Sequence, residues 1–129
     1  MIEPMDFSLT EAERDLAGLC RDFAQNEIAP RAPQAWEDAV CPTDLLREMG
    51  ALGLLGLLIP EEWGGAGLDY ISFAILCEEL ERADTAYRVV LSVHAGLNSL
   101  ALLQWATDEQ KRRWLVPQAQ GKKLATFGL

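Results

Sequence analysis

The stretch that decides the fold is Ile59-Pro60-Glu61-Glu62-Trp63-Gly64-Gly65-Ala66-Gly67-Leu68-Asp69. Its proline, paired acids and three glycines separate two regions rich in helix signals, so we interpret it as a loop between helices. Its glycines do not make a dinucleotide-binding fingerprint, because Tyr70 stands where the third glycine is needed and no strand–turn–helix pattern surrounds them. Glu61 and Glu62 are neighbours in this loop, which predicts a solvated turn and not an acid–base pair.

Three helices are predicted before this loop. Ser8-x-x-Glu11 and Thr10-x-x-Glu13 both fit a capping box. The apolar residues that follow at helical spacing predict a first helix of about four turns; they are Leu16, Leu19, Cys20, Phe23 and Ile28. Pro30 and Pro33 end this helix or start a short second one. Another helix is predicted to begin at Pro42-Thr43-Asp44 and to end near Gly50.

The glycines at 50, 53 and 56 allow two interpretations. Their spacing of three fits a face on which helices pack closely. It also fits a turn that leads into an extended apolar segment ending at Ile59, and this second interpretation is favoured.

Three further helices are predicted after the loop. The first runs from Asp69 to Arg82, and Asp84-Thr85 then caps a long helix that reaches Trp105. Thr107-x-x-Gln110 is a capping box that opens the last helix, which Gly121 closes. The fold class is therefore all-α, a helical bundle over residues 1–122. Residues 123–129 have no helical period and are predicted to be extended, as the start of a following β-domain whose strands lie beyond this chain.

Composition narrows the possible partners and kinds of site. A net charge of -9 disfavours nucleic acid and anionic membranes as partners. Cys20, Cys41 and Cys77 form no CxxC pair, so we expect them to be reduced and buried, and no spacing typical of metal ligands occurs.

The acidic N-terminus does not resemble a signal peptide, which predicts a cytoplasmic protein. Residues 89–106 carry no charge and approach the length of a membrane span, but polar residues interrupt them, so a buried central helix is favoured.

Short segments along nearly the whole chain carry a resemblance to a known family: Phe7-x-Leu9-Thr10-Glu11, Phe23-Ala24-x-x-Glu27-Ile28-x-Pro30, Gly53-Leu54-Leu55-Gly56, the loop from Pro60 to Asp69, Glu78-Glu79-Leu80, Ser92-Val93-His94 and Asp108-Glu109-Gln110-Lys111. In these segments and in their order the chain resembles the N-terminal domain of the flavin-dependent acyl-CoA dehydrogenases. The resemblance implies a helical domain followed by a β-domain and a second helical bundle. It also implies an enzyme that removes a proton and a hydride from an acyl-CoA thioester and passes the hydride to FAD.

Further expectations follow from this resemblance. The catalytic base of the family is a glutamate from the C-terminal domain, so no residue of this chain is assigned a catalytic role. Phe127, Gly128 and Leu129 would begin the stretch that contacts the flavin. The expected partners are an acyl-CoA substrate and an electron acceptor such as an electron-transfer flavoprotein, in a homo-oligomer.

By the same resemblance, Val93, His94 and Leu97 would line the floor of the acyl pocket. The residues alone leave another interpretation open, since Val90, Val93, Leu97 and Leu100 recur at helical spacing and fit ordinary core packing. A single histidine in an apolar helix is more typical of a hydrogen-bonded core residue than of a catalytic base.

Arg88 lies in the first turn of the long helix, where the helix dipole disfavours a cation. It either forms a helix-end ion pair with Glu81 or meets a carboxylate on the substrate. Three segments resemble the glutaryl-CoA dehydrogenase branch of the family: Glu81, Tyr87-Arg88 and Phe127-Gly128-Leu129. Two features differ from it, since Val89 and Val90 replace its small residues and Asn26-Glu27-Ile28 resembles the straight-chain branch. The length of the acyl chain is therefore left open.

Two functions are carried forward. In the first, the chain is the N-terminal segment of an acyl-CoA dehydrogenase and is inactive by itself. In the second, it is a stand-alone helical interaction module, or one subunit of a split enzyme, without flavin.

Overall fold

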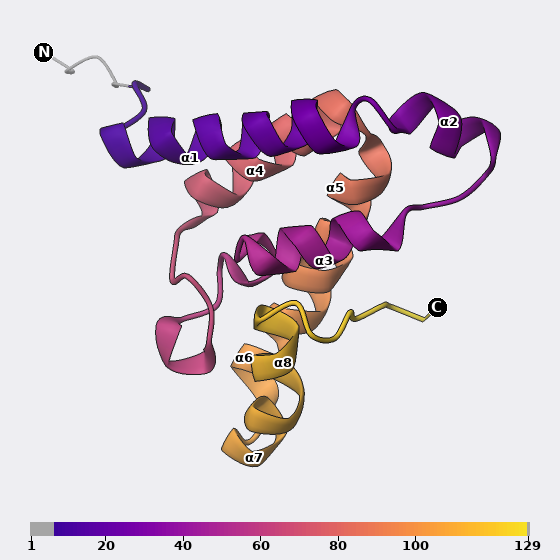
Figure 1. The fold of residues 1–129 in the computed structure, drawn as a ribbon. Helices are drawn as coiled ribbons and strands as arrows, with labels where there is room; N and C mark the ends of the chain where they lie inside the picture. The colour runs from indigo at the N-terminus through magenta and orange to yellow at the C-terminus, as the bar shows by residue number, and fades with distance from the viewer. Residues whose placement is uncertain (1–6, 129) are drawn as a thin grey trace, which may run out of the picture.

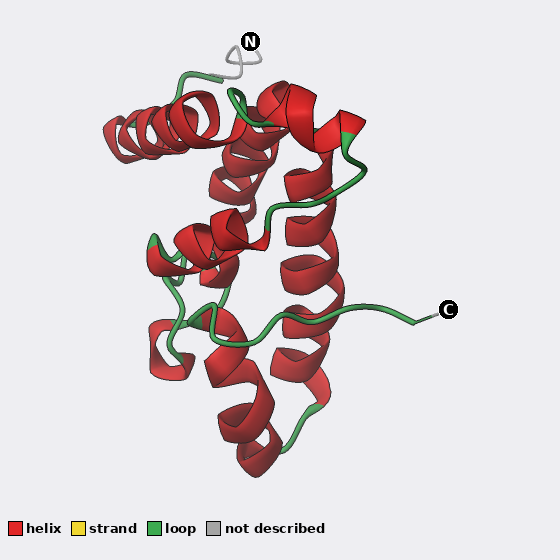
Figure 2. Ribbon diagram, turned by 45° about the vertical axis from the view of Figure 1, so that its right-hand side comes forward, coloured by secondary structure: helices red, strands yellow, loops and turns green. Residues whose placement is uncertain are grey.

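A computed structural model describes residues 7–128 (Figure 1). Within this range the chain consists of helices and loops without a strand, which confirms the all-α fold class (Figure 2). Several α-helices continue directly into π-helical segments, so the described residues form six continuous helices. These are α1 (Glu11–Phe23) with η1 (Ala24–Ile28), α2 (Ala32–Glu37), α3 (Thr43–Ala51), α4 (Tyr70–Ala83), α5 (Thr85–Leu91) with η4 (Ser92–Ser99) and α6 (Leu100–Trp105), and α7 (Asp108–Gln110) with η5 (Lys111–Leu115) and α8 (Val116–Ala119). The short 3-10 helices η2 (Leu54–Gly56) and η3 (Glu61–Trp63) lie between α3 and α4.

The helices begin at the predicted caps. The capping box at Thr10 is formed, and the Thr10 hydroxyl accepts a hydrogen bond from the Glu13 N–H at 3.2 Å. Asp69 caps α4 and Asp84 caps α5 through their side-chain oxygens. Thr107 and Gln110 form the capping box of α7. Each cap satisfies backbone N–H groups that have no partner within the helix.

The main core lies between α1, α3, α4 and α5. In Figure 1, α1 runs across α4, and α3 lies below α1 and in front of the long helix. Side chains of α3 and of the long helix belong to the same core. The large side chains that are fully buried in this core are Ile28, Leu45, Met49, Leu55, Leu57, Leu76, Leu80, Tyr87 and Leu91. A smaller cluster of Ile59, Leu115 and Ala119 joins α8 to the segment after α3. Burial of each such leucine or isoleucine contributes about 1.5–3 kcal/mol to folding.

The loop from Pro60 to Asp69 folds back onto the segment that precedes it. The N–H groups of Ala66 and Gly67 donate to the Gly56 and Ile59 carbonyls at 3.1 Å and 2.9 Å, and Leu68 N–H donates to Leu57 O at 2.9 Å. A side chain at Gly65 would collide with the backbone carbonyls of Ile59 and Gly56. The glycines of this motif are therefore required by the fold.

Glu61 and Glu62 are exposed in η3, so the prediction of a solvated turn at this pair is confirmed.

The prediction of an extended segment that ends at Ile59 is wrong. The turn itself is present, because Gly53 has a φ of 76°. The residues after it form η2 and further turns. Gly50 and Gly56 instead serve the close-packing interpretation: a Cβ on Gly50 would lie 2.8 Å from Gly121 Cα, and one on Gly56 would collide with the Ala119 backbone. The spacing of the glycines allowed this interpretation, but it did not identify their packing partners, Gly121 and Ala119, which lie far along the chain.

The helix from Thr85 to Trp105 is buried along one face only. It is 21 residues long with a mean hydropathy of 1.2, so by length and composition alone it is able to cross a membrane, a test that core helices of soluble proteins also pass. Only 28% of its most apolar window is buried, and α6 contains no buried residue. The prediction of a buried central helix is therefore correct for one face and wrong for the other.

The cysteine prediction needs a similar correction. Cys20 is buried and Cys77 is half-buried, but Cys41 is exposed, because the loop between α2 and α3 lies at the surface. All three are free thiols. Residues 122–128 follow α8 as a chain without regular structure that crosses the long helix (Figure 2). The domain boundary at residue 122 stays a prediction.

Candidate functional site

The residues predicted to form the site lie on the long helix, on the end of α4 beside it, and on the tail that crosses it. Glu81 is in the last turn of α4 and Arg88 is in α5. Val93, His94 and Leu97 are in η4. Phe127 and Gly128 are in the tail, and Leu129 lies outside the described residues.

Arg88 and Glu81 form the predicted ion pair across the corner between α4 and α5. Arg88 Nε lies 2.7 Å from Glu81 Oε2, and the Thr85 hydroxyl donates to Glu81 Oε1 at 2.7 Å. The hydrogen bond from Arg88 holds the pKa of Glu81 below its usual range. The two side chains are 34% and 47% exposed, so the pair is open to solvent and is screened by it. A guanidinium has five N–H donors, so Arg88 can donate a hydrogen bond to a second carboxylate and keep its hydrogen bond to Glu81.

The apolar stripe divides between the core and the solvent. Val90 packs against the main core and Leu100 packs against the smaller cluster. Val93 is half-buried, whereas Leu97 is 51% exposed and lines an open cleft of about 480 Å³ with Tyr70 and Trp105. Core packing thus explains Val90 and Leu100 but not Leu97, whose face of the helix is uncovered.

His94 is fully buried, and both of its ring nitrogens have partners. Nε2 lies 3.2 Å from the Gln118 carbonyl oxygen, and Nδ1 accepts the Ala125 N–H at 3.1 Å. Burial lowers the pKa of His94, and the hydrogen bond with Gln118 partly offsets this effect. These contacts agree with the interpretation of His94 as a hydrogen-bonded core residue.

The tail is attached to the helices at several points. Asn98 Nδ2 donates to the Thr126 carbonyl at 2.9 Å, next to the His94–Ala125 hydrogen bond. Phe127 is 57% exposed and Gly128 is exposed. The sequence analysis did not propose Asn98 or Gln118 as site residues. Asn98 could have been found, because it is a polar residue one helical turn after His94 in a stretch without charges.

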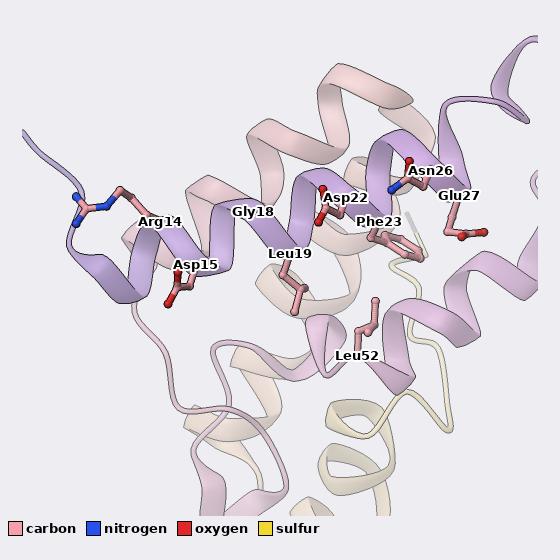
Figure 3. A pocket seen from close by; sticks show the side chains of 9 residues that line it. All are labelled: Arg14, Asp15, Gly18, Leu19, Asp22, Phe23, Asn26, Glu27 and Leu52. Atoms are coloured by element: carbon pink, nitrogen blue, oxygen red, sulfur yellow. The ribbon is translucent and has the colours of Figure 1, made fainter.

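A separate pocket of about 680 Å³ lies on α1 and contains none of the predicted site residues (Figure 3). Figure 3 shows Leu19 and Phe23 pointing from α1 toward Leu52. Asp15, Asp22 and Glu27 belong to the same lining, so the apolar centre of this pocket has an acidic rim.

No group of three or more His, Cys, Asp or Glu residues that could hold a metal ion occurs within residues 7–128.

The fold and these contacts define an all-helical domain whose longest helix has an uncovered apolar face beside a tethered tail. Residues 10–122 match the family model described as "Acyl-CoA dehydrogenase, N-terminal domain". The chain therefore belongs to the acyl-CoA dehydrogenase family, as its N-terminal domain.

Individual relatives agree with this assignment. The chain is 40% identical to the human mitochondrial short-chain specific acyl-CoA dehydrogenase over 121 residues, which are 94% of this chain and 29% of the relative. Among solved structures, the butyryl-CoA dehydrogenase of Megasphaera elsdenii superposes with a TM-score of 0.88 at 32% identity, covering 93% of this chain and 32% of that one. A glutaryl-CoA dehydrogenase of Mycobacterium smegmatis in complex with FADH2 superposes with a TM-score of 0.85 at 33% identity, covering 90% and 30%. The chain thus spans about a third of the length of the relatives it matches.

Proposed function

We propose that the chain is the N-terminal domain of an FAD-dependent enzyme that oxidises an acyl-CoA thioester to the 2,3-enoyl-CoA. The observation that carries this proposal is the uncovered apolar face of the long helix, which lies beside the tethered tail in a chain that matches the family over residues 10–122. In this proposal the domain forms one wall of the acyl and flavin pocket, with Val93 and Leu97 facing the acyl chain. It is not catalytic alone, because the base is expected from another domain.

The tail has the features that a flavin contact needs. Phe127 offers an exposed aromatic ring, and the N–H groups of Phe127 and Gly128 are not bonded by any of residues 7–128. Exposed backbone donors are suitable partners for the polar edge of a flavin ring. FAD, when bound, accepts the hydride; these residues would position the ring and exclude water from one side. Leu129 would extend the same contact.

The relatives guide the choice of substrate and partners. They include short-chain, butyryl-CoA and glutaryl-CoA dehydrogenases, and one structural relative, with a TM-score of 0.89, is described as an electron transferring flavoprotein of Acidaminococcus fermentans. We therefore propose a short acyl-CoA as substrate and an electron-transfer flavoprotein as acceptor. We also propose a homo-oligomeric enzyme in the cytoplasm, for which the sequence analysis is the support.

A dicarboxylic acyl-CoA is a second candidate substrate, and Arg88 is the observation that favours it. Its side chain is one-third exposed on the same continuous helix as Val93 and Leu97, and it has N–H donors beyond the one bonded to Glu81. A carboxylate at the far end of the acyl chain would form a charge-assisted hydrogen bond there.

The test is a chimera in which this chain replaces the N-terminal domain of the Megasphaera butyryl-CoA dehydrogenase. The visible spectrum reports flavin retention, and bleaching by butyryl-CoA or glutaryl-CoA reports substrate oxidation. We expect the chimera to retain FAD and to be bleached, while the 129-residue chain mixed with FAD shows neither. In the chimera, Arg88→Leu separates the two substrates, because only bleaching by glutaryl-CoA depends on Arg88 if the dicarboxylic candidate is correct.

The alternative function predicts a different outcome. A correctly folded chimera that never retains flavin would contradict the enzyme proposal and favour the helical interaction module.

A further inference from the structure

The tail is held by contacts of two kinds. The N–H groups of Lys122 and Lys123 donate to the Pro117 carbonyl at 2.8 Å and 3.1 Å, which only continues the turn after α8. Further along the tail, the Ala125 N–H donates a hydrogen bond to His94 Nδ1, and the Thr126 carbonyl accepts one from Asn98 Nδ2. These two hydrogen bonds, both from η4, fix the course of the tail just before Phe127.

The contacts of His94 define its protonation state. The Ala125 N–H is a donor, so Nδ1 must carry a lone pair. The Gln118 carbonyl is an acceptor, so Nε2 must carry the proton. The ring is therefore the neutral Nε2–H tautomer, and a second proton would have to be placed on Nδ1, directly against the Ala125 N–H.

The surroundings of the ring are polar but uncharged. The Ser99 hydroxyl lies 2.9 Å from the His94 carbonyl oxygen and 3.1 Å from Gln118 Oε1. The elements that pack most extensively against η4 are α5, α6, α8 and η2. Among their residues only Arg88 is charged, and it is paired with Glu81.

Two cations lie on the tail itself, and both are engaged elsewhere. The Lys122 ammonium group donates to Gln120, and the Lys123 ammonium group lies over the Trp114 ring. The causes of the pKa shift of His94 are burial and the hydrogen bond with Gln118, so no carboxylate among residues 7–128 acts on the ring to stabilise an imidazolium.

We propose that His94 is a positioning residue: as a neutral imidazole it clamps the tail to the long helix, and protonation of Nδ1 releases Ala125 and the residues that follow it. The clamp holds together two segments that are distant in sequence. Its consequence for FAD rests on the function proposed above, because Phe127 and Gly128 follow Ala125 directly. The clamp itself does not depend on that function.

The direction of the pH effect follows from the burial of the ring. Burial lowers the pKa of His94 below its ordinary value of about 6.5. The unfolded or released state therefore takes up the proton first as the pH falls. The clamp is intact above about pH 6.5 and weakens between that value and the lower pKa of the clamped ring.

The first experiment measures nitrogen NMR of the His94 ring and hydrogen exchange of backbone amides in the 129-residue chain. We expect the Nε2–H tautomer at pH 7. Loss of one hydrogen bond of ordinary strength corresponds to roughly a threefold to tenfold fall in protection. The Ala125 amide should lose this protection with the same midpoint as the ring titration, while Lys123, bonded to Pro117, keeps its own.

Three results would overturn the proposal. The first is an Nδ1–H or charged ring at pH 7. The second is a ring titration without a change at Ala125. The third is loss of protection at Ala125, Lys123 and the buried Leu91 together, which would mean that acid unfolds the whole domain.

Two matched variants separate the two hydrogen bonds of the His94 ring, the one with Ala125 and the one with Gln118. His94→Asn places an amide oxygen near the position of Nδ1 and keeps an acceptor for Ala125. His94→Gln places its amide group near the position of Nε2 and keeps the contact with Gln118 only. We expect protection of Ala125 to survive in His94→Asn without the pH dependence and to be lost in His94→Gln; equal protection in both variants would contradict the clamp. Asn98→Ala is the control, since it removes the neighbouring tether and should preserve the pH dependence at Ala125.

The link to FAD is tested separately in the chimera. His94→Gln should retain less flavin than His94→Asn. If the parent chimera binds no flavin at all, the proposed function fails, whereas the Ala125 measurements still decide the clamp. If either variant does not fold, the ring titration of the unmodified chain decides it.

Discussion

One side of the helix from Thr85 to Trp105 is covered by the rest of the domain and the other is open to solvent, although both sides are apolar. On the covered side, Tyr87, Leu91 and Ala95 are buried in the main core. On the open side, Leu97 and Trp105 are 51% and 79% exposed. The polar residues His94 and Ser99 lie on the covered side, because their partners are inside the chain. Hydropathy therefore does not identify the packed side of this helix; the buried polar residues and their hydrogen bonds do.

The open side is also the part of the helix that the proposed function uses. Exposed apolar surface of this extent is characteristic of interaction surfaces. It fits a chain that spans about a third of its relatives, in which other domains would supply the cover.

The largest expected difference between the two sides is between Leu91→Ala and Leu97→Ala. Leu91 is fully buried, so its truncation should lower the free energy of unfolding by about 2–5 kcal/mol. Leu97 is half-exposed, and its truncation should change that free energy by less than about 0.5 kcal/mol. Urea denaturation followed by circular dichroism measures both. Similar losses in the two variants would mean that the open side is covered in solution.

A smaller effect is expected where α8 reaches the covered side. Gly56 permits the close approach of the Ala119 backbone, so Gly56→Ala should destabilise the domain by about 1–3 kcal/mol. The control is Gly18→Ala in α1, where an added Cβ meets no atom within 4 Å and the helix should gain up to about 1 kcal/mol. Thermal unfolding of the two variants should shift in opposite directions; a neutral Gly56→Ala would show that α8 is free to move.

The smallest effect is expected at Glu81 in α4, which pairs with Arg88 near the start of the long helix. Glu81→Gln removes an exposed ion pair, so it should lower the melting temperature only slightly at pH 7 and low salt. The pKa of Glu81 is lowered by Arg88, so the contribution of the pair is present above the ordinary carboxyl pKa and is lost as the pH falls through the lowered value. Melting curves of the variant and the parent chain should converge at acid pH and at high salt. A difference that persists at both would show that Glu81 acts through contacts other than charge.

The sequence predicted features whose causes are local. Thr10, Asp69 and Asp84 each cap a helix through a bond to an N–H two or three residues away, so their chemistry is visible in a short window. The ion pair of Arg88 and Glu81 was also predicted, because the two residues flank one helix corner.

The remaining features depend on residues that are distant in sequence. Gly50 was interpreted as a helix stop, with close packing as the less favoured interpretation of the three glycines, because its packing partner Gly121 is distant in sequence. His94 was correctly interpreted as a hydrogen-bonded residue, yet its partner Ala125 lies in a segment for which the sequence showed only an extended tail. The exposure of Cys41 depends on how the loop between α2 and α3 lies on the domain, which composition does not determine.

The contact between Gly50 and Gly121 has a consequence for the order of folding. It joins backbone near the end of α3 to backbone just after α8, so it has a large sequence separation. During synthesis, α1, α3 and α4 can collapse together while the later helices are still inside the ribosome, but the glycine contact must wait for the last turn of the domain. A bulky residue at either position would therefore leave the early helices able to form and would act at the final docking of α8.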